Sequence, residues 1–144
     1  MTLAFRGSTQ PLNEADSCCI GNLLPYYGGN EPLKYEGDFF EVKRIIHESF
    51  KRIETNHKNG QSGIIVVHFT VTCDGTVTNV FTETFDFNYH HFNMDSQLVD
   101  ELEAIIKKLH RWIVGQDENG QKYCYHKFLS LKIKDGELEA IFPK

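Results

Sequence analysis

Residues 63–80 read GIIVVHFTVTCDGTVTNV, and this stretch decides which fold the chain can adopt. Two runs rich in β-branched residues flank Asp74-Gly75, a pair that readily takes the positive φ angles of a two-residue type I′ turn. The first run is apolar on both faces, which is typical of a strand that is covered on both faces or that lies in the centre of its sheet. We therefore predict a β-hairpin over 63–87 whose first strand is one or the other.

A helix is predicted on each side of this hairpin. Over 38–54, Asp38 and Glu41 resemble a capping box, and apolar residues then recur at helical spacing. Over 94–113, acidic side chains gather in the first half and basic side chains in the second, the distribution that the helix dipole favours. We expect Trp112 to close this second helix and to pack in the core.

The rest of the chain predicts two further strands, about 122–133 and 138–142, joined by a tight turn at Asp135-Gly136. The order α-β-β-α-β-β predicts a single α+β domain over 37–144. Such a domain is an antiparallel sheet of three or four strands with helices on one face. Residues 1–36 are rich in Pro and Gly and show little periodicity, so they are expected to form an irregular N-terminal arm.

Composition and charge narrow the classes of function. The chain has 144 residues, which suits one domain, and its net charge of −5 argues against binding nucleic acid. No apolar run approaches the roughly 18 residues of a membrane span, so no transmembrane segment is expected. Sequence motifs for phosphate loops, serine nucleophile elbows and zinc-binding helices are absent, and we therefore expect neither an enzyme nor a cofactor.

The histidines suggest an alternative function. In this alternative the chain is a metal-binding protein or an enzyme that uses His68, His90, His91 and a cysteine. Imidazoles next to carboxylates suit zinc or copper. Adjacent residues on an extended chain point to opposite sides, however, so His90 and His91 rarely reach the same ion. Exposed loop histidines are therefore the preferred interpretation, and no metal site is assigned.

The chain contains four cysteines, Cys18, Cys19, Cys73 and Cys124. In an oxidising compartment they allow three full pairings, among which the sequence does not choose. A disulfide between Cys73 or Cys124 and the Cys18-Cys19 pair would tie the N-terminal arm to the domain.

From about Tyr35 to Ile133 the chain resembles the C-terminal domain of TonB, the periplasmic energy transducer of Gram-negative bacteria. Several motifs carry the resemblance in the family's order. They are the aromatic-Gly segment 35–40, the Asp-Gly hairpin 63–80, the helix that closes on Trp112, and Gly115 followed by the Asn119-Gly120 turn. The chain departs from the family because it contains neither a membrane helix nor a Pro-rich spacer, so we do not expect it to transduce energy alone.

The resemblance implies a non-catalytic module that binds a protein or an extended peptide by adding it to a sheet edge. In the family mode that edge is the last long strand, and the residues expected to meet the partner are Tyr123, Tyr125, Lys127, Leu129 and Leu131. The Tyr123 and Tyr125 pair could equally belong to a packed strand face. A hairpin at 135–142 lies outside the family pattern and would block this edge if it paired there.

The resemblance also implies a periplasmic protein at the cell envelope, whereas a native start at Met1 would indicate the cytoplasm. Two readings of the partner remain open beside peptide capture. One is an inhibitor or immunity-like protein that binds another bacterial protein. The other is a homodimer formed through sheet edges.

Overall fold

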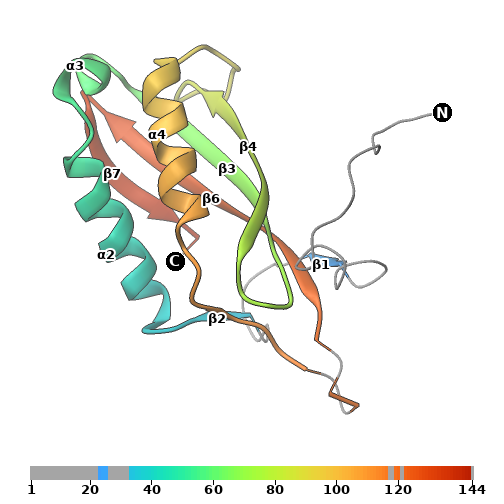
Figure 1. Cartoon of the computed structure of the whole chain (residues 1–144). Helices are drawn as coiled ribbons and strands as arrows, with labels where there is room; N and C mark the ends of the chain where they lie inside the picture. Colours follow the sequence, from blue (N-terminus) through green and yellow to red (C-terminus); the bar gives the residue numbers. More distant parts are fainter. Residues whose placement is uncertain (1–22, 26–32, 117–118, 121, 144) are drawn as a thin grey trace.

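The computed structural model describes residues 23–25, 33–116, 119–120 and 122–143 (Figure 1). It confirms the α+β class, with a mostly antiparallel sheet and three helices among these residues. The elements in chain order are β1 (Leu23–Pro25), β2 (Lys34–Tyr35), α2 (Asp38–Lys51), α3 (Thr55–Lys58), β3 (Gly63–Val71), β4 (Val77–Phe85), α4 (Ser96–Lys107), β5 (Trp112–Ile113), β6 (Cys124–Lys134) and β7 (Glu137–Phe142).

The main sheet is built around β3, which lies between β4 and β6. Of the two alternatives for a strand that is apolar on both faces, β3 is thus a central strand. Strands β4, β3, β6 and β7 pair with one another in this order, each pair antiparallel. The far edge of β6 has two neighbours: β7 pairs with residues 130–134, and β1 pairs in parallel with residues 124–126. The hairpin at 135–142 therefore does occupy the edge that the resemblance assigned to a partner.

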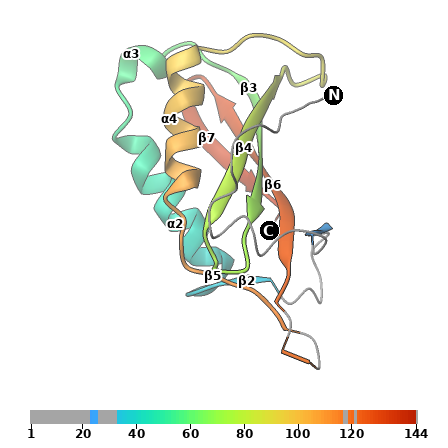
Figure 2. The same cartoon turned by 45° about the vertical axis from the view of Figure 1, so that its right-hand side comes forward.

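The core lies between the sheet and the helices, which Figures 1 and 2 place on the same side of the sheet. On both β3 and β6, odd-numbered residues face the helices, because side chains alternate along a strand. The fully buried members of this layer include Ile65, Val67, Phe69, Leu129, Leu131 and Ile133. Against them pack Val42 and Ile46 of α2 and Leu98, Leu102 and Ile106 of α4.

Helix α2 confirms a predicted helix but begins differently. Its N-cap is Gly37 with φ 88°, and no side chain caps the helix. The predicted capping box is therefore wrong, because the Glu41 carboxylate accepts from the guanidinium groups of Arg44 and Arg111 instead. The helix ends at Lys51, and the short helix α3, which the sequence did not predict, follows.

Helix α4 is shorter than the predicted 94–113. The Asp95 carboxylate accepts from the backbone N–H of Leu98 at 3.0 Å and starts the helix, which ends at Lys107. Trp112 does not close the helix: it belongs to strand β5, where it pairs with Tyr35 of β2. Its ring is buried as expected, and it meets the Tyr35 ring edge-on at 4.9 Å between centroids. A second, two-stranded sheet thus forms at residues predicted to be helix and arm.

The two Asp-Gly turns differ in type. At the β3–β4 connection only Gly75 takes a positive φ, 81°, and its N–H donates to the Thr72 carbonyl at 2.9 Å. This is a three-residue loop with a left-handed last residue, so the predicted type I′ turn is wrong here. At the β6–β7 connection Asp135 and Gly136 take φ 51° and 82°, which are the angles of a two-residue type I′ turn.

A bulge in β4 decides which way its aromatic residues point. His68 pairs with Phe81 and Thr70 pairs with Thr78, so the two residues between them on β4 oppose the single residue Phe69. Asn79, one of these two, has φ 55°. The bulge puts Val77 on the helix side, whereas Phe81 lies on the opposite side of the sheet, as β-bulges allow.

The predicted N-terminal arm contributes two of the described strands. Leu23–Pro25 forms β1 beside β6, and Lys34–Tyr35 forms β2 beside β5. Leu33 and Tyr35 are buried in the core. The remainder of 1–32 lies outside the described residues.

Candidate binding site on the open face of the sheet

The face of the sheet opposite the helices carries exposed aromatic side chains. No described helix covers this face, and Figure 2 shows the helices gathered on the other side. The exposed aromatic side chains on it, or in the loop next to it, are Phe81, Phe87, Tyr89, Phe128 and Phe142. They form two groups, one that lines a groove and one around His68, and exposed apolar groups of this kind are candidates for a binding site.

Part of this face forms a groove of about 430 Å³, which we call the open-face groove. It crosses four strands at one end of the sheet. Its lining consists of Ile64 and Val66 of β3, Phe85 of β4, Phe87 and Tyr89 of the following loop, Ser130 and Lys132 of β6, and Phe142 of β7. Most of these side chains are aromatic or aliphatic and few are polar, which is the usual composition of a ligand site.

A local turn after β4 positions the aromatic side of the groove. The Asp86 carboxylate accepts from the backbone N–H of His90 at 2.9 Å and from that of Asn88 at 2.8 Å. These backbone bonds lower the pKa of Asp86 and fix an Asx turn, in which Tyr89 takes φ 64°. The turn brings Phe87 and Tyr89 back to the sheet, where both line the groove.

Lys132 supplies the positive charge of the groove. Its Nζ lies 3.1 Å from a carboxylate oxygen of Glu139 and 5.4 Å from the centroid of the Phe87 ring. Both members of the ion pair are partly exposed, with 40% and 46% of their side-chain surface accessible. Ion pairs of this kind are held weakly because water screens them.

A second aromatic group lies further along the open face, around His68. The His68 ring stacks on Phe81 at 4.5 Å and lies 5.6 Å from the His126 ring. Its Nε2 lies 3.0 Å from a carboxylate oxygen of Glu83. Burial, and to a lesser extent the charge of His68, lowers the pKa of His126. The Nδ1 of the His68 ring is buried and finds no hydrogen-bond partner among the described residues. None of the residues of this group lines the groove.

The structure does not gather the histidines that the alternative reading requires. The His90 Nδ1 lies 3.5 Å from an Asp86 oxygen, and the His91 ring lies 4.6 Å from that of Phe85. His68 makes the separate contacts described above. Within the described ranges, no group of three or more His, Cys, Asp or Glu side chains could hold a metal ion.

The five residues predicted to meet a partner lie on β6 or directly before it. Tyr125, Leu129 and Leu131 are fully buried, Lys127 is 3% exposed, and Tyr123 is half-buried. Their side chains point to the helices, so a partner at the sheet surface cannot reach the buried four. The sequence left open whether the two tyrosines meet a partner or belong to a packed strand face. Tyr125 belongs to the packed face.

The residues of the groove were missed by the sequence reasoning. The signal that could have found them is the second apolar face of β3, formed by Ile64 and Val66. A central strand that is apolar on both faces needs cover on both, yet the two predicted helices lie on one face only. The sequence therefore already implied an apolar surface without a helix over it.

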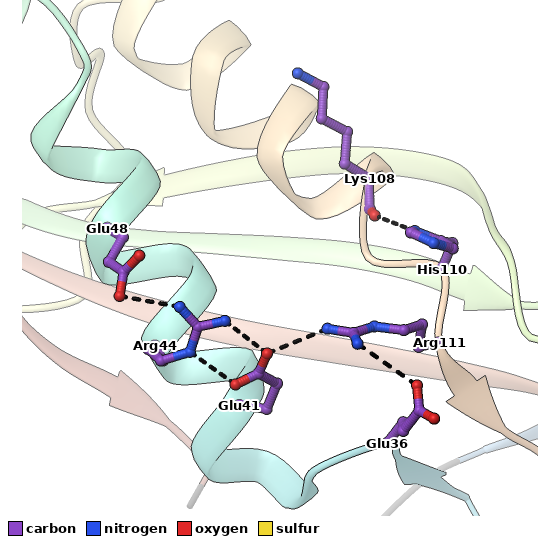
Figure 3. A network of polar contacts seen from close by, with 7 residues as sticks. All are labelled: Glu36, Glu41, Arg44, Glu48, Lys108, His110 and Arg111. Carbon is purple, nitrogen blue, oxygen red and sulfur yellow. Dashed lines mark hydrogen bonds and ion pairs between the residues drawn. The ribbon is translucent and has the colours of Figure 1, made fainter.

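A network of charges joins α2 to the segment that leads into β5 (Figure 3). Glu41 accepts from Arg44 at 2.6 Å and from Arg111 at 3.1 Å, and these bonds lower the pKa of Glu41 to about 2. Glu48 lies 3.0 Å from Arg44, and Glu36 lies 3.5 Å from Arg111. Each charged group of this exposed network has a partner, and Arg111 links the segment before β5 to Glu41 of α2.

Cys73, in the β3–β4 loop, and Cys124, at the start of β6, are both disulfide-bonded. Cys124 is fully buried. Neither is a free thiol, which removes both as candidate nucleophiles. Cys18 and Cys19 lie outside the described residues.

The chain matches no protein-family model, no curated protein and no solved structure. Across the residues that the structure describes, none of the helices has the length and apolar character needed to cross a membrane.

Proposed function

We propose that this chain is a non-catalytic module that binds an extended segment of a protein or peptide in the open-face groove. The observation that carries the proposal is an aromatic-lined groove on a sheet face that the described helices leave uncovered. Neighbouring strands lie about 4.8 Å apart, so a groove over four strands is about 14 Å long. About four residues of extended chain span that length at about 3.3 Å per residue.

The pairing of β6 is the reason to prefer the groove over the sheet edge. Addition of a peptide to β6 in the TonB manner would require β7 or β1 to leave its partner, because they pair with residues 130–134 and 124–126. A segment that enters the groove displaces no strand. The resemblance to the TonB C-terminal domain supports the class of function, because that domain binds extended chain. The groove supports the location proposed for the binding site.

Selection from a phage-displayed library of random peptides of about twelve residues tests the proposal. We expect selection on the native protein to enrich peptides that lose at least about tenfold in affinity on Phe87→Ser, because an aromatic wall of the groove is then missing. Phe128→Ser is the matched control. Phe128 is 41% exposed and Phe87 is 42% exposed, but Phe128 does not line the groove.

Both variants should have similar melting temperatures, since the two side chains are equally exposed and neither belongs to the core. Equal binding of the enriched peptides to native protein, Phe87→Ser and Phe128→Ser would place the binding surface elsewhere. The absence of any enrichment over an unrelated bait would overturn the proposal.

The disulfide-bonded state of Cys73 and Cys124 supports an oxidising compartment, such as the periplasm that the resemblance implies. Protein isolated from its native cell, with thiols blocked at lysis, should therefore show at most two alkylated cysteines out of four by mass spectrometry. After reduction before alkylation, all four should react. Three or four blocked thiols without reduction would instead indicate the cytoplasm.

A further inference from the structure

We infer that the open-face groove selects a segment in which one acidic residue is flanked by apolar residues two positions before and two positions after it. The inference rests on the proposed function and names the chemistry of the partner. It depends on the position and the charge of Lys132.

Among the described residues that line the groove, Lys132 is the one cation, and none is acidic. Its position on β6 puts it between apolar groups on two sides. Ile64 and Val66 of β3 lie on one side, and Phe142 of β7 lies on the other, because β6 pairs with both of those strands. An anion over Lys132 therefore has an apolar surface in both directions along the groove.

The ion pair with Glu139 leaves Lys132 able to bind a partner. A lysine ammonium has three N–H donors, and an ion pair with one Glu139 carboxylate oxygen at 3.1 Å does not occupy them all. Glu139 is not among the groove-lining residues and is partly exposed, so water readily replaces it. The Phe87 ring at 5.4 Å holds the ammonium near the groove by its negative face.

The position of Lys132 within the groove favours an acidic side chain over the carboxylate at a chain end. A terminal carboxylate over Lys132 would leave the groove filled on one side only. An internal Asp or Glu allows the segment to continue across both sides. The apolar area buried on binding is then larger, and this burial supplies most of the affinity at such a site.

The spacing of the flanking residues follows from strand geometry. In an extended segment, side chains two positions apart point the same way and lie about 6.6 Å from each other. Neighbouring strands of the sheet are about 4.8 Å apart. When the acidic residue lies over β6, one flanking side chain therefore lies near Ile64 and Val66 of β3, and the other lies near Phe142 of β7.

The overall charge of the protein restricts the acid to a single residue. A net charge of −5 repels strongly acidic segments at long range, whereas Lys132 attracts one carboxylate at close range. A run of several acidic residues would meet that repulsion and gain only one ion pair. The groove is thus expected to select for one acidic residue between apolar ones and against acidic runs.

The same library selection, repeated on Lys132→Gln, tests the inference. We expect peptides enriched on the native protein to share an Asp or Glu with apolar residues at both second neighbours, and this acid to disappear from peptides enriched on the variant. A capped synthetic peptide of the enriched sequence is then compared with its Glu-to-Gln form by fluorescence anisotropy. The Glu form should bind the native protein about fivefold more tightly, and both forms should bind Lys132→Gln alike. Lys134→Gln, which removes a lysine outside the groove, should keep the difference.

The outcomes separate the two proposals. Enriched peptides that depend on Phe87 but carry no preferred acid would overturn this inference and leave the proposed function standing. Enriched peptides in which the Glu and Gln forms bind the native protein equally would do the same. Selection that yields no peptide dependent on Phe87 would overturn both.

Discussion

Alanine at Gly75 is expected to lower the free energy of unfolding by about 2–4 kcal/mol. A Cβ at Gly75 would lie 2.2 Å from the backbone oxygen of Trp112, and a backbone atom cannot rotate away. Overpacking of this kind costs about 1–3 kcal/mol, and the positive φ adds about 1 kcal/mol for a residue other than glycine. Urea unfolding followed by far-UV circular dichroism measures the loss.

Gly60→Ala is the matched control for this substitution. Gly60 has φ 73°, close to the 81° of Gly75, but nothing lies within 4 Å of a Cβ built there. The free energy of unfolding of this variant should therefore fall by only about 1 kcal/mol, which is the contribution of the positive φ angle. Equal losses for the two variants would show that the close approach of the β3–β4 loop to β5 does not matter for stability.

The protein is expected to become more stable as the pH rises from about 7.5 to about 9.5. Lys127 is 3% exposed, and burial lowers the pKa of its ammonium to about 8 from 10.5. Between these two pKa values the unfolded chain binds more protons than the folded chain, so the free energy of unfolding increases with pH. The contribution over this interval is about 2 kcal/mol.

Lys127→Met provides the comparison, since it fills the same volume without a charge. The rings of Phe39 and Trp112, 5.9 Å and 5.8 Å from the Nζ, suit a methionine side chain as well. Urea unfolding at the two pH values should show the increase in the native protein and little of it in the variant. The same increase in both proteins would assign it to other groups.

Strong local patterns in the sequence were enough to predict several parts of the fold. The doubly apolar run at 63–71 predicted a strand that is central or covered on both faces, and β3 is central because it pairs on both sides. The apolar spacing after Asp38 identified α2. Asp135-Gly136 identified a tight turn between the last two strands. In each case one short segment contains the whole signal, so no distant contact is needed to interpret it.

The parts that were missed depend on contacts between distant segments. Trp112 continues the helical pattern of α4, but pairing with Tyr35 makes it a strand residue. The apolar alternation of β4 suggests a face turned to the core, but the bulge at Asn79 turns Phe81 to the open side. The open-face groove forms only when β4, β6 and β7 pair in one particular register. The apolar pattern of each separate strand does not specify that register.

Along β3 and β6, successive side chains point to opposite faces of the sheet. Odd-numbered residues such as Leu131 are buried under the helices, whereas even-numbered residues such as Lys132 line the open-face groove. Mutations at even positions can therefore accumulate during evolution with little loss of folding. A descendant of this chain could change the lining of the open-face groove by drift at Ile64, Val66, Ser130 and Lys132 while its architecture persists.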